Sequence, residues 1–120
     1  MVLLDDAADV RLLAEVVLGD MGGWQVSAAA TPAEAEALLR QGRVDVIVVD
    51  LILDGDDGLA WLARMRAAGV AADVPAVLLT GRPDAVDRDR AAELGVCGVI
   101  GKPVDPLHFS DQVAAATGRA

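Results

Sequence analysis

The chain has 120 residues, which suits one domain, and 54% of them are apolar, which is enough to bury a core. Its net charge of −9 argues against direct binding to nucleic acid, whose phosphates attract basic surfaces. No apolar run is long enough to span a membrane, nothing marks a secretory signal, and the single cysteine fits a reducing compartment. We therefore expect a cytoplasmic protein with neither a nucleic acid nor a membrane as its direct partner.

Apolar runs alternate with helical stretches along the chain, which is typical of a parallel sheet covered by helices on both faces. The runs predict strands at 2–4, 24–29, 44–49, 76–79 and 96–100. The helical stretches predict helices at 9–18, 32–40, 59–68 and 83–94, and a last one after Pro106. We therefore predict one compact α/β domain with three layers, five strands and five helices.

Start signals support several of these helices. Thr31, Pro32 and Glu34 combine a capping hydroxyl, a proline at the first helical position and an acid at the capping-box position. Pro83-Asp84 opens the fourth helix in this interpretation, and Asp105-Pro106 pairs a cap with a proline to open the last one. The segment 54–58 is expected to be a plain turn.

Three side chains elsewhere in these elements have ordinary structural interpretations. Cys97 lies in an apolar strand and is expected in the core, as is Trp61 on the third helix. His108 is expected at the surface of the last helix rather than as a phosphotransfer residue.

Polar residues follow four of the predicted strands at the point where each strand ends. Asp5 and Asp6 follow the first strand, Asp50 the third, Thr80 the fourth and Lys102 the fifth. Because open α/β sheets place their sites beyond the carboxyl ends of the strands, we expect these side chains on one rim.

This set of residues is suited to phosphoryl transfer. Two like charges about 4 Å apart repel by roughly 4 kcal/mol at an effective dielectric constant near 20, so the clustered acids favour a bound dication. Their hard oxygen ligands favour Mg²⁺ or Mn²⁺, and the lack of His or Cys argues against zinc. Asp50 would attack phosphorus, Lys102 would stabilise the transferring oxygens and Thr80 would donate to one of them. The charge of the product would then draw Thr80 inward and switch the conformation.

Taken in order, these residues resemble the receiver domain of bacterial two-component response regulators. The matching positions are the acid pair Asp5-Asp6, then Asp50, Gly58, Thr80 and Lys102-Pro103. The resemblance covers residues 1–120 and implies a flavodoxin-like sheet of order 2-1-3-4-5. We expect the whole chain to be one receiver domain with no output domain.

The resemblance implies a role for each of these residues. Asp50 would accept a phosphoryl group from the phosphohistidine of a sensor kinase or phosphotransfer protein. Asp6, Asp50 and the backbone carbonyl of Ile52 would bind Mg²⁺ directly, with Asp5 acting mainly through water. The Lys102-Pro103 bond is a candidate for the cis form. The domain would catalyse its own phosphorylation and dephosphorylation but act as a switch on a downstream protein, not as an enzyme. A homodimer is also compatible with the resemblance.

The sequence departs from the family pattern in three places. Val99 stands where the family usually has Tyr or Phe, so we expect a muted change on the face that reports phosphorylation. Asp54 stands where a proline is common. Ile52 and Arg82 occupy positions that tune hydrolysis in the family, and these bulky groups predict a slowly hydrolysing aspartyl phosphate.

Two other functions remain open at this point. A degenerate receiver that serves only as a docking module would fit Val99 and the acidic turn. A phosphatase with an aspartate nucleophile would also use Asp50, but such enzymes commonly need a second acid where this chain has Ile52.

Overall fold

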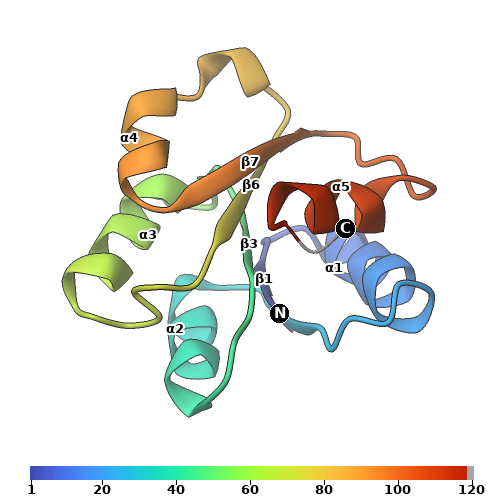
Figure 1. Cartoon of the computed structure of the whole chain (residues 1–120), viewed down its shortest axis with the longest axis horizontal. Helices are drawn as coiled ribbons and strands as arrows, with labels where there is room; N and C mark the ends of the chain where they lie inside the picture. Colours follow the sequence, from blue (N-terminus) through green and yellow to red (C-terminus); the bar gives the residue numbers. More distant parts are fainter. Residues whose placement is uncertain (119–120) are drawn as a thin grey trace.

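Five parallel strands form the centre of the molecule, and helices lie on both faces of this sheet (Figure 1). The computed structural model describes residues 1–118. Within that range, no helix is both long and apolar enough to cross a membrane. In chain order the elements are β1 (Val2–Leu4), α1 (Ala8–Ala14), the π-helix η1 (Glu15–Asp20), β2 (Ser27–Ala29), α2 (Pro32–Gln41), β3 (Ile47–Asp50), β4 (Ile52–Leu53), β5 (Asp56–Asp57), α3 (Gly58–Ala67), β6 (Ala76–Thr80), the 3₁₀-helix η2 (Pro83–Ala85), α4 (Arg88–Glu93), β7 (Val96–Gly101) and α5 (Phe109–Ala116).

The sheet has the order β2-β1-β3-β6-β7, with every neighbouring pair parallel. Since β6 and β7 are its fourth and fifth strands, the predicted flavodoxin-like order 2-1-3-4-5 is confirmed. β2 and β3 begin later than predicted, because their partner β1 begins only at Val2, which pairs with Ser27 and Ile47. The predicted plain turn at 54–58 was incomplete: β4 and β5 form a small antiparallel hairpin there.

Alternating strand residues pack into two separate hydrophobic cores, one on each face of the sheet. Ile47 and Val49 of β3 pack with α2, α3 and α4, whereas Val46 and Val48 pack with α1, η1 and α5. Successive strand side chains point to opposite faces, so a strand buried on both sides is apolar throughout. Trp61, with 1% of its surface exposed, lies in the first core as predicted.

The start of α2 agrees with its sequence signal. The Thr31 hydroxyl accepts a hydrogen bond from the Glu34 amide at 3.2 Å, and Pro32 occupies the first helical position. The Glu34 carboxylate accepts from the Ala30 amide, one residue earlier than in a regular capping box.

The helix predicted from Pro83 onward is divided in two. Pro83 starts only the 3₁₀ turn η2, after which Val86 adopts an extended conformation and buries its side chain in the first core. The carboxylate of Asp87 then caps α4 by accepting from the Arg90 amide at 3.1 Å. The prediction of one continuous helix was wrong. Val86 leaves the helical conformation and buries its side chain, and this burial outweighs the local preference for a helix that Pro83 signals.

The last helix begins later than Asp105-Pro106 predicted. The carbonyl of Asp105 accepts from the amides of His108 and Phe109, and its carboxylate accepts from the Leu107 amide. Asp105 therefore closes a turn ahead of α5, and the helix starts at Phe109. His108 is exposed, as predicted.

Cys97 is exposed, so its expected place in the core was wrong. β7 is an edge strand, and its register against β6 passes from Val96 to Gly98 without using Cys97. A bulge of this kind takes one residue out of the regular alternation, which turns Cys97 towards solvent.

Candidate functional site

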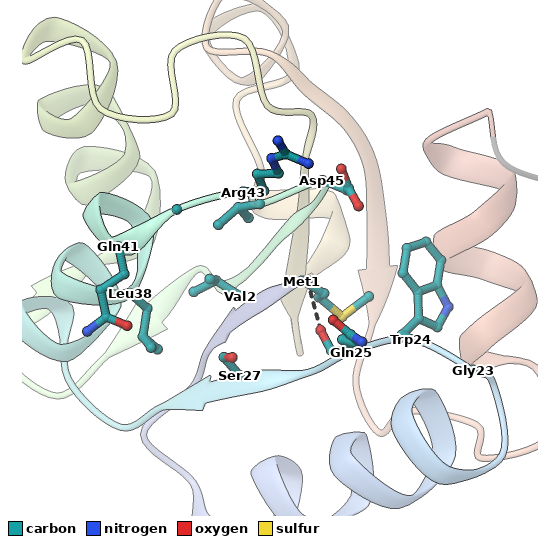
Figure 2. A pocket seen from close by; sticks show the side chains of 12 residues that line it. Met1, Val2, Gly23, Trp24, Gln25, Ser27, Leu38, Gln41, Arg43 and Asp45 are labelled. Atoms are coloured by element: carbon teal, nitrogen blue, oxygen red, sulfur yellow. Dashed lines mark hydrogen bonds between the residues drawn. The ribbon is translucent and has the colours of Figure 1, made fainter.

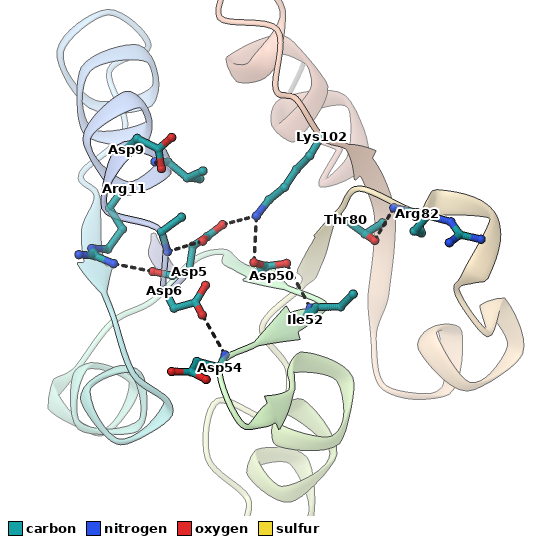
Figure 3. Close-up of polar contacts among 12 residues, drawn as sticks. Asp5, Asp6, Asp9, Arg11, Asp50, Ile52, Asp54, Thr80, Arg82 and Lys102 are labelled. Carbon is teal, nitrogen blue, oxygen red and sulfur yellow. Dashed lines mark hydrogen bonds and ion pairs between the residues drawn. The ribbon is translucent and has the colours of Figure 1, made fainter.

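Four strand ends meet at one edge of the sheet and bring the predicted polar residues together (Figure 3). Asp5 directly follows β1, Asp50 ends β3, Thr80 ends β6 and Lys102 directly follows β7. Parallel strands share the direction of their carboxyl ends, so the fold itself collects these side chains. The Lys102-Pro103 bond is cis, as predicted.

Lys102 lies between two carboxylates from different strands. Its ammonium is 2.8 Å from Asp5 Oδ2 and 2.9 Å from Asp50 Oδ2. The Asp5 and Asp50 side chains are 0% and 8% exposed, and that of Lys102 is 22% exposed. Ion pairs at this burial are charge-assisted hydrogen bonds with little solvent screening.

Backbone amides fix the remaining carboxylate oxygens. Asp5 Oδ1 accepts from the Ala7 amide at 2.9 Å, and Asp50 Oδ1 accepts from the Ile52 amide at 3.2 Å. Asp6 is exposed, and its Oδ2 accepts from the Asp54 amide at 2.8 Å. The β1–α1 and β3–α3 loops are therefore joined across the site.

Gly58 explains why the chain can turn so closely beneath Asp50. A Cβ at this position would lie 1.9 Å from the carbonyl oxygen of Asp50, closer than any side chain can be accommodated. The Gly58 amide also donates to the Leu51 carbonyl at 2.8 Å. A side chain here would push α3 away from the strand end that carries Asp50.

The donor set fits a hard dication. Asp5, Asp6 and Asp50 each offer a carboxylate oxygen, and these atoms lie within 4.8 Å of one another. The three carboxylates outnumber the single ammonium of Lys102, which contacts two of them, and this leaves an excess of negative charge for a dication to balance. All-oxygen ligands favour Mg²⁺ or Mn²⁺. Among residues 1–118 no other group of three potential metal ligands occurs.

The charges of this site shift two pKa values. Burial raises the pKa of Asp50; the hydrogen bond from Lys102 lowers it, and the charge of Asp5 raises it again. Burial lowers the pKa of Lys102, but its hydrogen bonds with Asp5 and Asp50 outweigh that effect and raise it overall. The pKa of Asp50 is therefore raised mainly by its burial, and that of Lys102 by the two carboxylates that it contacts.

Thr80 lies on the neighbouring strand end and is 1% exposed. Its hydroxyl oxygen accepts from the Arg82 amide at 2.9 Å, and its carbonyl accepts from the Lys102 amide at 2.7 Å. A hydroxyl can accept and donate at the same time, so the bond from Arg82 does not use the Thr80 proton.

The residues predicted to modulate the site lie at its margin. The side chain of Ile52 is exposed, and the Arg82 guanidinium extends beyond Thr80 towards Asp84, 3.7 Å away (Figure 3). Val99 is half-buried and packs against the first core. The metal-binding role of the Ile52 carbonyl and the effects of Arg82 and Val99 stay predictions.

Sequence reasoning missed Arg11 of α1, whose Nη1 donates to the Asp5 carbonyl at 2.9 Å. Side chains on a helix lean towards its amino terminus. A long cation one turn into a helix that follows an acidic strand end can therefore reach back over that strand end. This spacing makes the contact possible, but it does not identify the Asp5 carbonyl as the acceptor.

A surface cavity lies elsewhere, at the amino ends of the strands (Figure 2). It measures about 490 Å³, and its lining includes Trp24, Gln25 and Arg43, with the terminal ammonium of Met1 bonded to the Gln25 carbonyl at 2.9 Å. Asp45 is its only carboxylate, so the charge needed for phosphoryl chemistry is at the opposite edge.

Comparisons with known proteins give a consistent result. A model of the response regulator receiver domain matches residues 1–114. The phosphate regulon transcriptional regulatory protein PhoB of Pseudomonas aeruginosa is 26% identical over 98% of this chain and 51% of its own length. The probable transcriptional regulator ycf27 of Guillardia theta is 31% identical over 98% of this chain and 44% of its own. The chain thus spans about half the length of these curated relatives.

A solved structure shows the same fold. The chemotaxis protein CheY4 of Vibrio cholerae aligns with a TM-score of 0.86 at 23% identity, covering 96% of this chain and 95% of that one.

Proposed function

Because the chain belongs to the response regulator receiver domain family, we propose that Asp50 accepts a phosphoryl group from a phosphohistidine donor in a Mg²⁺-dependent reaction. One observation carries the proposal: the Lys102 ammonium bridges Asp5 and Asp50 beside Asp6, at the carboxyl edge of the sheet. The donor would be a sensor histidine kinase or a phosphotransfer protein.

The transfer begins with an Asp50 carboxylate oxygen attacking phosphorus. The bond between phosphorus and the donor imidazole nitrogen breaks as the bond to Asp50 forms, and the imidazole leaves with the electron pair and takes up a proton. Asp5, Asp6 and Asp50, with the Ile52 carbonyl, would hold Mg²⁺, which when bound supplies positive charge for the phosphoryl oxygens.

Lys102 and Thr80 act on the transferred group. Transfer to Asp50 turns its Lys102-paired carboxylate into an acyl phosphate, so the ammonium moves to a phosphoryl oxygen with little displacement. The Thr80 hydroxyl donates its free proton to another such oxygen. That motion draws in the Thr80–Arg82 segment ahead of η2.

The protein partner reads this motion through α4 and β7. Val99 has no ring to swing inward, so the expected change on the face of α4, β7 and α5 is small. Large, uniform chemical-shift changes across that face on addition of a phosphate analogue would contradict this part of the proposal.

The proposal includes a long-lived aspartyl phosphate. Ile52 lies beside Asp50 with an exposed side chain, and Arg82 follows Thr80; as the residues at positions that tune hydrolysis in the family, both would hinder an attacking water. Replacing each with Ala should shorten the phosphoryl half-life, measured by intact mass after removal of the donor. Unchanged half-lives in both variants would refute the idea.

The main test is incubation with Mg²⁺ and acetyl phosphate, followed by intact mass spectrometry. We expect a gain of one phosphoryl group that disappears in Asp50→Asn and persists in Asp54→Asn, a matched control in the same loop. No gain in the folded wild-type protein would favour a docking module instead. Catalytic turnover of added phosphoesters would favour a phosphatase.

The cellular setting is part of the same proposal. A downstream protein is the expected target, and a cytoplasmic location agrees with a chain whose single cysteine can form no intramolecular disulfide. The homodimer stays a prediction, which sedimentation of the free and phosphorylated forms would check.

A further inference from the structure

Arg11 makes a contact that the family motif does not include. It lies on α1, is half-buried, and extends back over the end of β1, where its Nη1 donates to the Asp5 carbonyl at 2.9 Å (Figure 3). The side chain thus connects a helix to the peptide group that joins Asp5 to Asp6.

The Asp5–Asp6 peptide joins a residue that several hydrogen bonds hold in place, Asp5, to a more loosely held one, Asp6. Asp5 is anchored by its amide on the Ala29 carbonyl at 3.1 Å and by both carboxylate oxygens. Asp6 is exposed, and its carboxylate is held by a bond from the Asp54 amide. Since a peptide group is planar, fixing the Asp5 carbonyl also fixes the direction in which the chain enters Asp6.

We propose that Arg11 is a positioning residue for the dication site, holding the Asp5–Asp6 peptide so that the Asp6 carboxylate stays within reach of the metal. This inference rests on the proposed function, because it requires Mg²⁺ at the acidic cluster. Arg11 touches neither the metal nor the phosphoryl group, and acts through the backbone alone.

Arg11 could affect Mg²⁺ binding through its hydrogen bond or through its charge, and the two effects have opposite signs. A nearby guanidinium repels a dication, so removal of its charge alone would tighten binding. Loss of the hydrogen bond releases the peptide and weakens binding. The sign of the change in Mg²⁺ affinity shows which effect is the larger.

The experiment titrates the whole chain with Mg²⁺ alone by isothermal calorimetry. In Arg11→Met we expect about a threefold to tenfold rise in Kd, less than the roughly 10–100-fold typical when a direct partner of a metal ligand is lost. Arg11→Lys keeps the charge but lacks the planar fork, so it should give at least as large a rise, because the repulsion of Mg²⁺ remains. Arg40→Met removes an equal charge from α2, where Arg40 pairs with Glu36, and should leave Kd unchanged.

A second readout separates positioning from chemistry. With acetyl phosphate, Arg11→Met should raise the Mg²⁺ concentration that gives half the maximal phosphorylation rate, rather than lower the rate at saturating Mg²⁺. A lower saturated rate would overturn the positioning role. If Arg11→Met fails to fold, Arg11→Lys provides the comparison, and a Kd equal to or below that of wild type would overturn the inference.

Failure of the proposed function would look different from failure of this inference. A wild-type protein that binds no Mg²⁺ or gains no phosphoryl group would refute the proposed function. A wild-type protein that does both, with Arg11→Met binding Mg²⁺ as tightly or more tightly, would refute only the role of Arg11.

Discussion

Two half-buried cations, Lys102 and Arg66, join distant segments of this molecule in contrasting ways. Lys102 contacts two carboxylates at the functional edge. Arg66, near the end of α3, donates to three backbone carbonyls, those of Ala71 and Val74 in the α3–β6 loop and that of Leu94 at the end of α4. Burial lowers the pKa of Arg66, which the charge of Asp73 partly restores.

The two cations differ in whether the charge around them is balanced. Around Arg66, one planar guanidinium donates to three carbonyl oxygens of the α3–β6 loop and the end of α4, of which that of Ala71 also accepts from the Val74 amide. Around Lys102, the carboxylates exceed the cations, and a further charge is needed to balance them. The contacts of Arg66 therefore stabilise the fold, whereas the excess negative charge around Lys102 favours the binding of a cation.

Replacement of Lys102 tests the functional side of this comparison and has the largest expected effect. Lys102→Met should lower the rate of phosphorylation by acetyl phosphate by about 100-fold or more, because a preorganised charge at the transferring oxygens is lost. The rate is followed by intact mass at saturating Mg²⁺. A rate within a few-fold of wild type would remove Lys102 from the mechanism.

Replacement of Arg66 tests the structural side. Arg66→Met should lower the free energy of unfolding by about 2–3 kcal/mol, because three hydrogen bonds from a half-buried cation to backbone carbonyls are lost. Urea denaturation measures the loss, and phosphorylation per folded molecule should stay at the wild-type level. Should the variant keep full stability but lose phosphorylation, the assignment of the two cations would have to be reversed.

Mg²⁺ itself should stabilise the fold through the acidic cluster. At a Mg²⁺ concentration ten times its Kd, the free energy of unfolding should rise by about 1.4 kcal/mol over that in EDTA. Arg66→Met should retain this increment, and Asp6→Asn should lose most of it. An increment that survives Asp6→Asn would place the metal outside the cluster.

The His108–Asp105 pair is an exposed ion pair, in contrast to the half-buried Lys102 and Arg66, and we expect its effect on stability to be the smallest. Its Nδ1 is 2.7 Å from Asp105 Oδ2, and this hydrogen bond, with the charge of Asp105, raises the pKa of His108 above 6.5. A raised histidine pKa stabilises the fold below the unfolded value and loses that contribution as pH rises through the folded one. Because both side chains are exposed, the gain is small.

An NMR titration of the imidazole checks this value. We expect Asp105→Asn to lower the pKa of His108. An unchanged midpoint would show that the pair does not persist in solution.

The sequence predicted correctly those site residues whose place follows from the order of strands and helices along the chain. Apolar runs that end in acid, Thr or Lys predicted the rim at Asp50, Thr80 and Lys102, because parallel strands align their ends. The same reasoning misplaced the starts of two helices. Pro83 and Asp105-Pro106 have local signals for a helix, but the burial of Val86 and the turn bonds of Asp105 were stronger than those signals.

Arg11 and Arg66 could not be predicted in the same way. Their acceptors are backbone carbonyls, which every residue carries and which no sequence pattern distinguishes. Their roles become visible only when the fold brings those carbonyls within reach. Cys97 was misjudged for a related reason, since the bulge that exposes it depends on how β7 pairs with β6.

The exposed Cys97 also has a practical consequence for watching the switch. It is the only thiol in the chain and stands two positions before Val99 on the edge strand, so a maleimide dye would attach at one defined place without further engineering. Although the residue is exposed, its sulfur donates to the Ala76 carbonyl, and partial desolvation raises the thiol pKa. Labelling should therefore be slow at neutral pH and faster in mild alkali. The bound fluorophore would report from β7, the strand that carries Val99.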